Sequence, residues 1–148
     1  MPCGKGTWPA IWTLGSKGSW PEDGELDILE HLGRDPGRAS SAVHTSAGHA
    51  DHSVYGALRV AAACRKFHRY QMHWTADGVT FSVDGFVHLH YPRLDAGPRA
   101  WPFDDPQYLI VNLAIGGDLG GAVDDRIFPA VMEVDYVRIY QEWKPPTD

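Results

Sequence analysis

The sequence predicts an all-β fold. Sixteen glycines and eleven prolines in 148 residues separate many short runs in which apolar and polar side chains alternate, a combination typical of strands joined by turns. Asp84-Gly85 lies between two such runs and is a strong signal for a two-residue hairpin. Hydrophobic residues make up 43% of the chain, enough for one core, and the length is too short for two domains of ordinary size. We therefore expect residues 1–148 to form a single domain.

The expected strands follow from alternation, bounded by turn signals. A mostly apolar run at 107–114 is predicted to be a central strand buried on both faces, and an alternating run at 132–141 is predicted to close the fold. Segments rich in glycine, serine or proline are predicted to be loops, including 116–121. The remaining predicted strands are 11–14, 25–31, 40–45, 70–74, 79–83 and 86–90.

Charge and hydropathy exclude several functional classes. The net charge of −6 gives no electrostatic reason to expect nucleic acid or an anionic membrane as a partner. No apolar run approaches the ~20 residues of a membrane span. The first residues show neither the basic nor the apolar region of a signal peptide.

Three acids alternate with three aliphatic residues in the predicted strand at 25–31. Glu25 and Asp27 share one face of a strand, but strict alternation would place Leu29 beside them instead of Glu30. All three acids share a face only if the strand has one extra residue, a β-bulge, near Ile28 and Leu29. Bulges often redirect side chains beside active sites.

With that bulge, the side chains of Glu25 and Glu30 can lean toward each other. Their carboxyl groups can then approach the ~5 to 5.5 Å that suits a retaining glycosidase, with one nucleophile and one acid/base. Asp27 would lie between them, disfavour full ionisation of the group and orient the nucleophile. The alternative is a solvated strand or helix face with three ordinary acids.

The three acids form the pattern Glu-x-Asp-x-x-Glu, and Trp-Pro-Ala-x-Trp precedes it at residues 8–12. Both patterns resemble the signature of glycoside hydrolase family 16, in particular its bacterial laminarinase-like members, and this resemblance favours the first interpretation. The resemblance spans nearly the whole chain. It continues through Phe67-His68-x-Tyr70, Trp74-Thr75, Phe81-x-Val83-Asp84-Gly85, Trp101-Pro102-Phe103-Asp104, the run from 108 to 117 and the run from 134 to 140.

The resemblance implies a role for each carboxylate: Glu25 as nucleophile, Asp27 as its assistant and Glu30 as general acid/base. It implies a β-jelly-roll sandwich of the concanavalin type, with a long cleft that binds β-1,3 or mixed β-1,3/1,4 glucan and cuts inside the polymer. It also implies retention of anomeric configuration, no required cofactor and a secreted or periplasmic location.

Family members usually carry several strands before the segment that matches residues 4–8. We therefore expect this chain to correspond to the carboxy-terminal portion of a domain. A sheet that lacks strands exposes edges and part of its core, which predicts marginal stability or association with another copy.

Aromatic and histidine side chains supply candidate substrate contacts, since indole faces stack on sugar rings. Trp8 and Trp20 lie in turn-rich segments near the acids, and they are the predicted sugar-stacking residues, with Trp101 as a third. Trp12 and Trp74 are expected to fill the core. The resemblance places His44 near the acid/base, where it either hydrogen-bonds a carboxylate or sugar hydroxyl, or caps a strand end.

Metal and disulfide predictions rest on fewer residues. His44, His49 and His52, with Asp51 beside them, do not have a zinc-binding spacing and are interpreted as polar surface. Many relatives bind a structural calcium through amino-terminal residues and an aspartate that corresponds to Asp135. The matching amino-terminal ligands are absent here, so any calcium site is expected to be weak or empty. Cys3 and Cys64 either pair in an oxidising compartment or are free thiols.

Two departures from the family pattern leave the acids untouched. The loop at 116–121 lacks the Trp-Pro that often follows paired glycines in laminarinases, which concerns the substrate preference, and His73 stands where glutamate is common.

Two other functions stay open. One is a non-catalytic glucan-binding or inactive fragment of such an enzyme, in which the shortened cleft wall leaves the acids mispositioned, and the other is an interaction fragment without sugar affinity.

Overall fold

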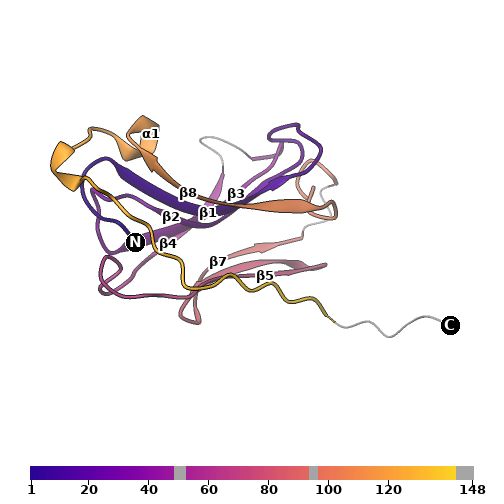
Figure 1. Ribbon diagram of the computed structural model, residues 1–148. Helices are drawn as coiled ribbons and strands as arrows, with labels where there is room; N and C mark the ends of the chain where they lie inside the picture. Colours follow the sequence, from indigo (N-terminus) through magenta and orange to yellow (C-terminus); the bar gives the residue numbers. More distant parts are fainter. Residues whose placement is uncertain (49–52, 94–96, 143–148) are drawn as a thin grey trace.

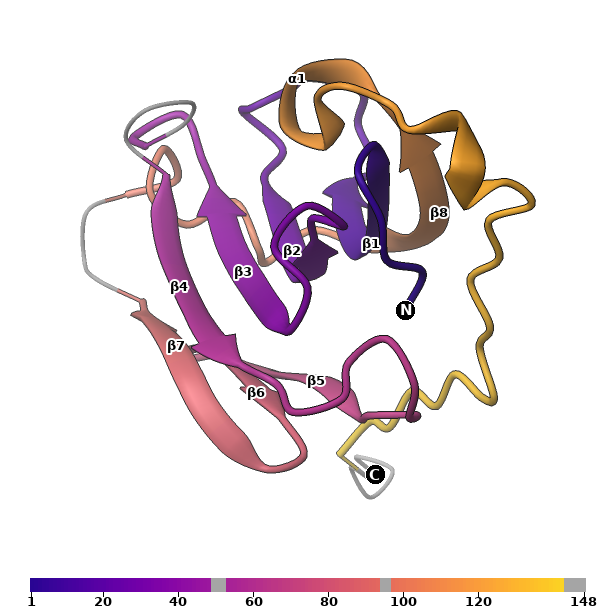
Figure 2. The ribbon, with the colours of Figure 1, turned by 90° about the vertical axis from the view of Figure 1, so that its left-hand side faces the viewer.

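The computed structural model describes residues 1–48, 53–93 and 97–142, which fold into two antiparallel sheets facing each other (Figure 1). The larger sheet has the strand order β4-β3-β2-β1-β8 and the smaller has the order β5-β6-β7. Figure 2 shows β8 and β4 at opposite ends of the larger sheet. The predicted all-β, two-layer architecture is thus confirmed. The strands are β1 (Thr7–Gly15), β2 (Glu25–His31), β3 (Arg38–His44), β4 (Val54–Arg59), β5 (Tyr70–Thr75), β6 (Gly78–Val83), β7 (Phe86–Pro92) and β8 (Gln107–Ile115).

The predicted bulge is present in β2. Ile11 of β1 pairs with Leu29, but the next residue of β1, Trp12, pairs with Asp27, so Ile28 is the extra residue. The register with β3 shifts over the same interval, between Asp27 and Glu30. The bulge lets Leu29 reach the core, where it is fully buried, while Glu30 stays on the acid face.

The core lies between the two sheets in two clusters. Strand β2 contributes Leu26 to the first cluster and, because of its bulge, Leu29 to the second. The predicted hairpin at Asp84-Gly85 brings β6 and β7 together, with Gly85 at φ 87°. Burial of these side chains holds the larger sheet against the smaller one. The first cluster contains Leu26, Val43, Val79, Phe81, Leu89, Trp101 and Phe103, and the second contains Leu29, Ala39, Val60, Ala63 and Val83.

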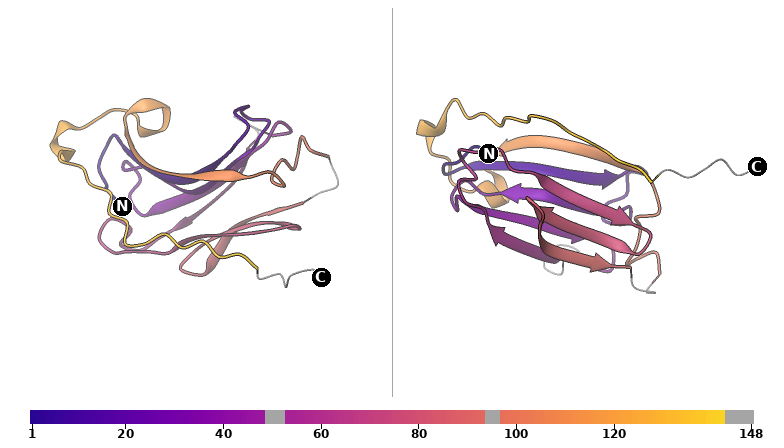
Figure 3. Two further views of the ribbon diagram at one scale, coloured as in Figure 1. Left: turned by 45° about the vertical axis from the view of Figure 1, so that its right-hand side comes forward. Right: turned by 90° about the horizontal axis from the view of Figure 1, so that it is seen from below.

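The prediction of a closing strand at 132–141 is wrong. The segment follows a short 3-10 helix, η2 (Asp125–Ile127), and runs as an extended chain past the smaller sheet without strand pairing (Figures 1 and 3). Ile139 and Tyr140 are 84% and 82% exposed. A segment in which apolar and polar side chains alternate can lie on a sheet, but a strand also needs a neighbouring backbone for its hydrogen bonds. No described strand pairs with residues 132–141.

Three other expectations are corrected. The apolar run in β8 is at the edge of the larger sheet instead of its centre, and Tyr108, Leu109 and Val111 are exposed there. The loop predicted at 116–121 contains one helical turn, α1 (Gly117–Gly120). Strand β4 was not predicted, because Gly56 interrupts the run of strand-forming side chains. The glycine is needed there because a Cβ at this position would lie only 2.5 Å from the carbonyl oxygen of His88.

Cys3 and Cys64 form a disulfide that joins the amino terminus to the segment after β4. Of the two alternatives left open by the sequence, the paired state is the one observed. The described part of the chain contains no helix with the length and apolar character needed to cross a membrane.

Gly24, directly before the acidic strand, is expected to tolerate no side chain. Its φ is +78°, and a Cβ would lie 2.5 Å from Cε1 of Phe103 and 2.6 Å from Cγ of Pro102. Replacement by alanine should lower the free energy of unfolding by about 2 to 4 kcal/mol, from backbone strain plus overpacking. Gly18, at φ +87° with nothing within 4 Å, is the control, and Gly18→Ala should cost only about 1 to 2 kcal/mol. Equal costs in urea unfolding would contradict the steric argument.

Candidate active site

Strand pairing brings the three acids together on one face of the larger sheet. In β1, Leu14, Trp12 and Ala10 lie opposite Glu25, Asp27 and Glu30, respectively. On the other side, His44 of β3 lies opposite Glu25. Asp27 is only 4% exposed, while both glutamates are half-buried. The middle carboxyl is therefore enclosed and the outer two are accessible.

Each acid has a hydrogen-bond partner from a different element. Nε1 of Trp8 donates to Oε1 of Glu30 at 3.1 Å, and Nε1 of Trp20 donates to Oε2 of Glu25 at 2.5 Å. Asp27 Oδ2 lies 2.9 Å from Nε2 of His44, which matches the predicted carboxylate contact of that histidine. The indoles proposed to stack on sugar thus hold the two glutamates, a role that the sequence did not suggest.

Burial favours the protonated form of two of the three acids, Asp27 and Glu30. Burial, with the charges of Glu25 and Glu30, raises the pKa of Asp27 to about 7, although the hydrogen bond from His44 opposes this. Burial also raises the pKa of Glu30, against the hydrogen bond from Trp8. Burial alone would lower the pKa of His44, but the contact with Asp27 and the nearby acids outweigh it and raise the pKa. A protonated Glu30 beside an ionised carboxylate is what acid/base chemistry requires.

Trp12 is a site residue that sequence reasoning assigned to the core. It is half-buried, lies opposite Asp27 on the acid face, and donates from Nε1 to Oδ1 of Asn112 at 2.8 Å. The signal that could have found it is parity, because Trp12 alternates with Trp8 along β1. Trp74 is also not core, since it is 38% exposed on the smaller sheet.

Trp101 does not belong to the predicted sugar-stacking set. It is 4% exposed within the first core cluster, and its ring centroid lies 5.3 Å from that of Phe103. Its Nε1 donates to Oδ1 of Asp104 at 3.3 Å. A ring enclosed on both faces offers no surface to a sugar, and the sequence motif alone did not distinguish this burial from display on the surface.

The structure gives little support to a calcium site. Asp135 is exposed in the unpaired segment after η2, and within the described ranges it belongs to no group of ligand-bearing side chains close enough to share an ion. Calcium prefers six to eight oxygen ligands, so one surface carboxylate does not fit it. Glu25, Asp27 and His44 each bring one ligand-type atom within 4.8 Å of the others, and their hydrogen bonds already pair them. His49, Asp51 and His52 lie outside the described residues.

Two accessible glutamates thus flank a buried aspartate on a bulged strand of a two-sheet sandwich. Comparison with known proteins gives the family. The model of glycosyl hydrolases family 16 matches residues 1–138, so the chain belongs to glycoside hydrolase family 16.

Two relatives from Rhodothermus marinus are similar over most of this chain. A β-glucanase is 43% identical over 157 aligned residues, which cover 95% of this chain and 54% of that protein. The X-ray structure of the laminarinase from this organism superimposes with a TM-score of 0.84 at 39% identity, covering 88% of this chain and 57% of that one. The likeness confirms the predicted jelly-roll sandwich. The chain spans just over half the length of each of these two proteins.

A relative named for glucan binding also matches. The β-1,3-glucan-binding protein of Penaeus monodon is 30% identical over 184 aligned residues, which cover 98% of this chain and 50% of that protein.

Proposed function

We propose that this chain carries the catalytic acids of a retaining endo-β-glucanase that hydrolyses β-1,3 or mixed β-1,3/1,4 glucan. The observation that carries the proposal is the placement of Glu25, Asp27 and Glu30 on one face by the β2 bulge, each with its own hydrogen-bond partner. The similarity to a β-glucanase and a laminarinase supports the substrate class.

In the proposed first step, Glu30 transfers its proton to the glycosidic oxygen while a carboxylate oxygen of Glu25 attacks the anomeric carbon. The glycosidic bond breaks, the leaving chain departs as an alcohol, and a glycosyl ester of Glu25 forms. In the second step Glu30, now ionised, takes a proton from water, whose oxygen displaces Glu25 from the anomeric carbon. Two inversions retain the β-configuration.

Asp27 and His44 limit the negative charge beside the two glutamates. The enclosed Asp27 carboxyl and the His44 imidazole lie 2.9 Å apart, so a proton between them limits the negative charge beside the glutamates. We propose that Asp27 orients the nucleophile, while burial raises the pKa of Glu30 and so favours its protonated form.

Substrate contacts are proposed for the aromatic residues around the acids. Trp20 is 51% exposed, and its ring centroid lies 6.3 Å from that of His44 beside the nucleophile. Trp8 is half-buried at the acid/base. An indole can donate its N–H to a carboxylate and still present a ring face. Each tryptophan can therefore stack on a sugar while its N–H holds a glutamate in place.

The test is release of reducing ends by the purified chain. Laminarin and a mixed-linkage glucan should be cut internally, so that viscosity falls before small sugars accumulate, whereas agarose and carrageenan should not be cut. Absence of hydrolysis on every β-glucan would contradict the enzymatic proposal.

Removing the Trp8 hydrogen bond should move the alkaline limb of the pH profile. This hydrogen bond favours the ionised form of Glu30 and so lowers its pKa. In Trp8→Phe the pKa of Glu30 should rise, the acid should stay protonated to higher pH, and the alkaline limb of kcat/KM should shift upward. Trp74→Phe, which changes an exposed indole on the other sheet, is the control and should leave the limb in place. A downward shift in Trp8→Phe would contradict the assignment.

A non-catalytic β-glucan-binding module is the second candidate, and the similarity to the Penaeus monodon glucan-binding protein favours it. Such a module would change its tryptophan fluorescence on adding laminari-oligosaccharides without releasing reducing ends. A chain that shows neither response would instead act as an interaction fragment.

We also propose a secreted or periplasmic location, which the Cys3–Cys64 disulfide supports because disulfides persist in oxidising compartments. No calcium-dependent step is included, since the calcium proposal at Asp135 has no ligand cluster behind it.

Association with a second copy through exposed edges is a further proposal. Phe86, Ile139 and Tyr140 are at least 73% exposed, and apolar surface of this kind is typical of contact sites. Sedimentation velocity at micromolar concentration should show a dimer, weakened in Ile139→Glu and unchanged in the control Lys66→Glu. A monomer that melts well above ~65 °C, the usual mesophile limit, would contradict both the association and the expected marginal stability.

A further inference from the structure

A second cluster of reactive side chains lies at the other end of β2 from the nucleophile. His31, the last residue of β2, is fully buried, and its Nε2 lies 3.9 Å from Sγ of Cys3. Cys3 is bonded to Cys64, and each of the three residues offers one ligand-type atom within 4.8 Å of the others. None of them contributes to the proposed hydrolysis.

The hydrogen bonding of His31 is incomplete. Its Nδ1 has no partner among the described residues, and its Nε2 faces only the weakly accepting sulfur of Cys3. Buried polar atoms are nearly always paired, so this imidazole, with one nitrogen unpaired and the other facing only a sulfur, needs an explanation. A cation at Nε2 would supply the strong partner that the sulfur does not.

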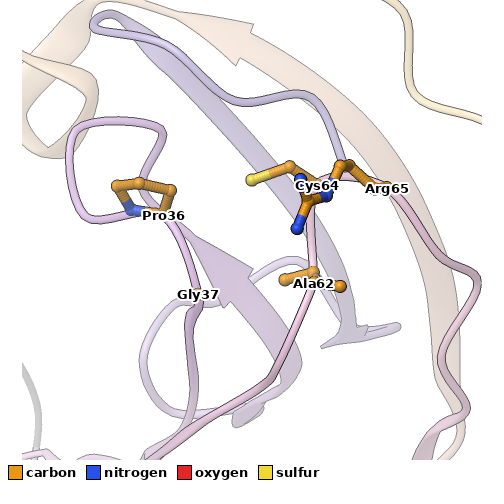
Figure 4. A pocket seen from close by; sticks show the side chains of 6 residues that line it. Pro36, Gly37, Ala62, Cys64 and Arg65 are labelled. Atoms are coloured by element: carbon orange, nitrogen blue, oxygen red, sulfur yellow. The ribbon is translucent and has the colours of Figure 1, made fainter.

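The cluster is reachable from solvent through Cys64. This residue is exposed and lines a surface hollow of about 300 Å³ together with Pro36, Gly37, Ala62, Ala63 and Arg65 (Figure 4). A small reductant or a hydrated cation can therefore approach the sulfur pair without unfolding of the core.

We propose that reduction of the Cys3–Cys64 disulfide creates a binding site for Zn²⁺ or a similar divalent transition cation, with the two sulfurs and His31 Nε2 as ligands. Tetrahedral zinc with Zn–S of about 2.3 Å and Zn–N of about 2.0 Å separates sulfur from nitrogen by about 3.5 Å. The observed separation of 3.9 Å between Cys3 Sγ and His31 Nε2 is close to that value. Water would complete the coordination.

The disulfide and the metal site exclude each other, because a disulfide sulfur is no thiolate. A phosphine reductant supplies the two electrons: the S–S bond breaks, each sulfur gains a proton, and the phosphine becomes its oxide with oxygen from water. Cation binding then displaces the two thiol protons, so uptake of the metal is coupled to proton release.

The experiment compares the oxidised full chain with the chain reduced by a phosphine and desalted without oxygen. Titration with Co²⁺ should show one ion per reduced chain and a thiolate-to-cobalt charge-transfer band, which Zn²⁺ removes. The oxidised chain should lack the band and bind more than about 100-fold more weakly, a larger effect than loss of an outer-sphere contact. His31→Gln should weaken cobalt binding, the double variant Cys3→Ser/Cys64→Ser should lose the band, and His73→Gln should behave as the parent.

Several outcomes would overturn the inference. These are a reduced, folded chain that binds no Co²⁺, binding without the charge-transfer band, and equal affinity in the parent and His31→Gln. If reduction unfolds the chain, Zn²⁺ should restore its β-sheet circular dichroism, because metal binding would then drive folding. Cobalt binding to a chain that stays unfolded would equally reject the site.

Discussion

Glu25→Gln is expected to reduce the hydrolysis of laminarin by about 10⁴-fold or more, because an amide cannot form the glycosyl ester on which the proposed reaction depends. Gln retains an oxygen that can accept from Nε1 of Trp20, so the fold and the binding of oligosaccharide should survive. The measurement is reducing-end release, with binding followed by tryptophan fluorescence.

The matched control is Glu22→Gln, three residues earlier in the exposed connection between β1 and β2. It removes the same charge from the same neighbourhood and should keep full activity. A Glu25→Gln variant that retains a tenth of the parental rate would show that Glu25 is not the nucleophile.

Glu30→Gln should slow the hydrolysis of two kinds of substrate to different extents. With glucan, whose leaving group needs a proton, the rate should fall by about 10² to 10⁴-fold. With an aryl β-glycoside that carries a good leaving group, the first step should be nearly unaffected and the second slow, which gives a burst of released phenol. Azide, which attacks without help from a base, should then speed turnover and yield a β-glycosyl azide.

Equal losses with glucan and aryl glycoside would contradict the assignment of Glu30 as acid/base. Glu133→Gln provides a control for loss of a carboxylate outside the site, since Glu133 is exposed in the unpaired segment beyond η2. It should leave both substrates unaffected.

The bulge in β2 could be predicted because two requirements conflict within seven residues. Leu29 must reach the core and Glu30 must join the other acids, and only an extra residue at Ile28 satisfies both. Local sequence therefore determined the most important backbone irregularity and, through it, the positions of all three carboxylates.

Features that depend on distant neighbours could not be predicted in this way. Alternation at 132–141 indicates a segment that can lie on a sheet, but it does not say whether a pairing edge is present. The mostly apolar sequence of β8 likewise predicts a strand buried on both faces, but in the structure β8 is an edge strand with exposed apolar side chains. The same limit applies to Trp101, which was predicted to stack on sugar and lies in the core, because the sequence motif does not reveal whether a ring is buried. Trp12 differs, since parity along β1 places it on the acid face.

The hydrogen bonds from Trp8 and Trp20 to the two glutamates also depend on tertiary structure. Trp8 lies in β1 and Trp20 in the connection to β2, and only strand pairing brings their N–H groups to Glu30 and Glu25. Their position in turn-rich segments adjoining the acidic strand had predicted these indoles to lie near the acids, and the structure adds how they hold them.

The central claim is that the acids on the bulged strand work as a retaining pair. Proton NMR of the first products formed from laminarin, recorded before mutarotation, tests it most directly. The account predicts that the new reducing ends appear initially as the β-anomer and then equilibrate. Initial appearance of the α-anomer would contradict it.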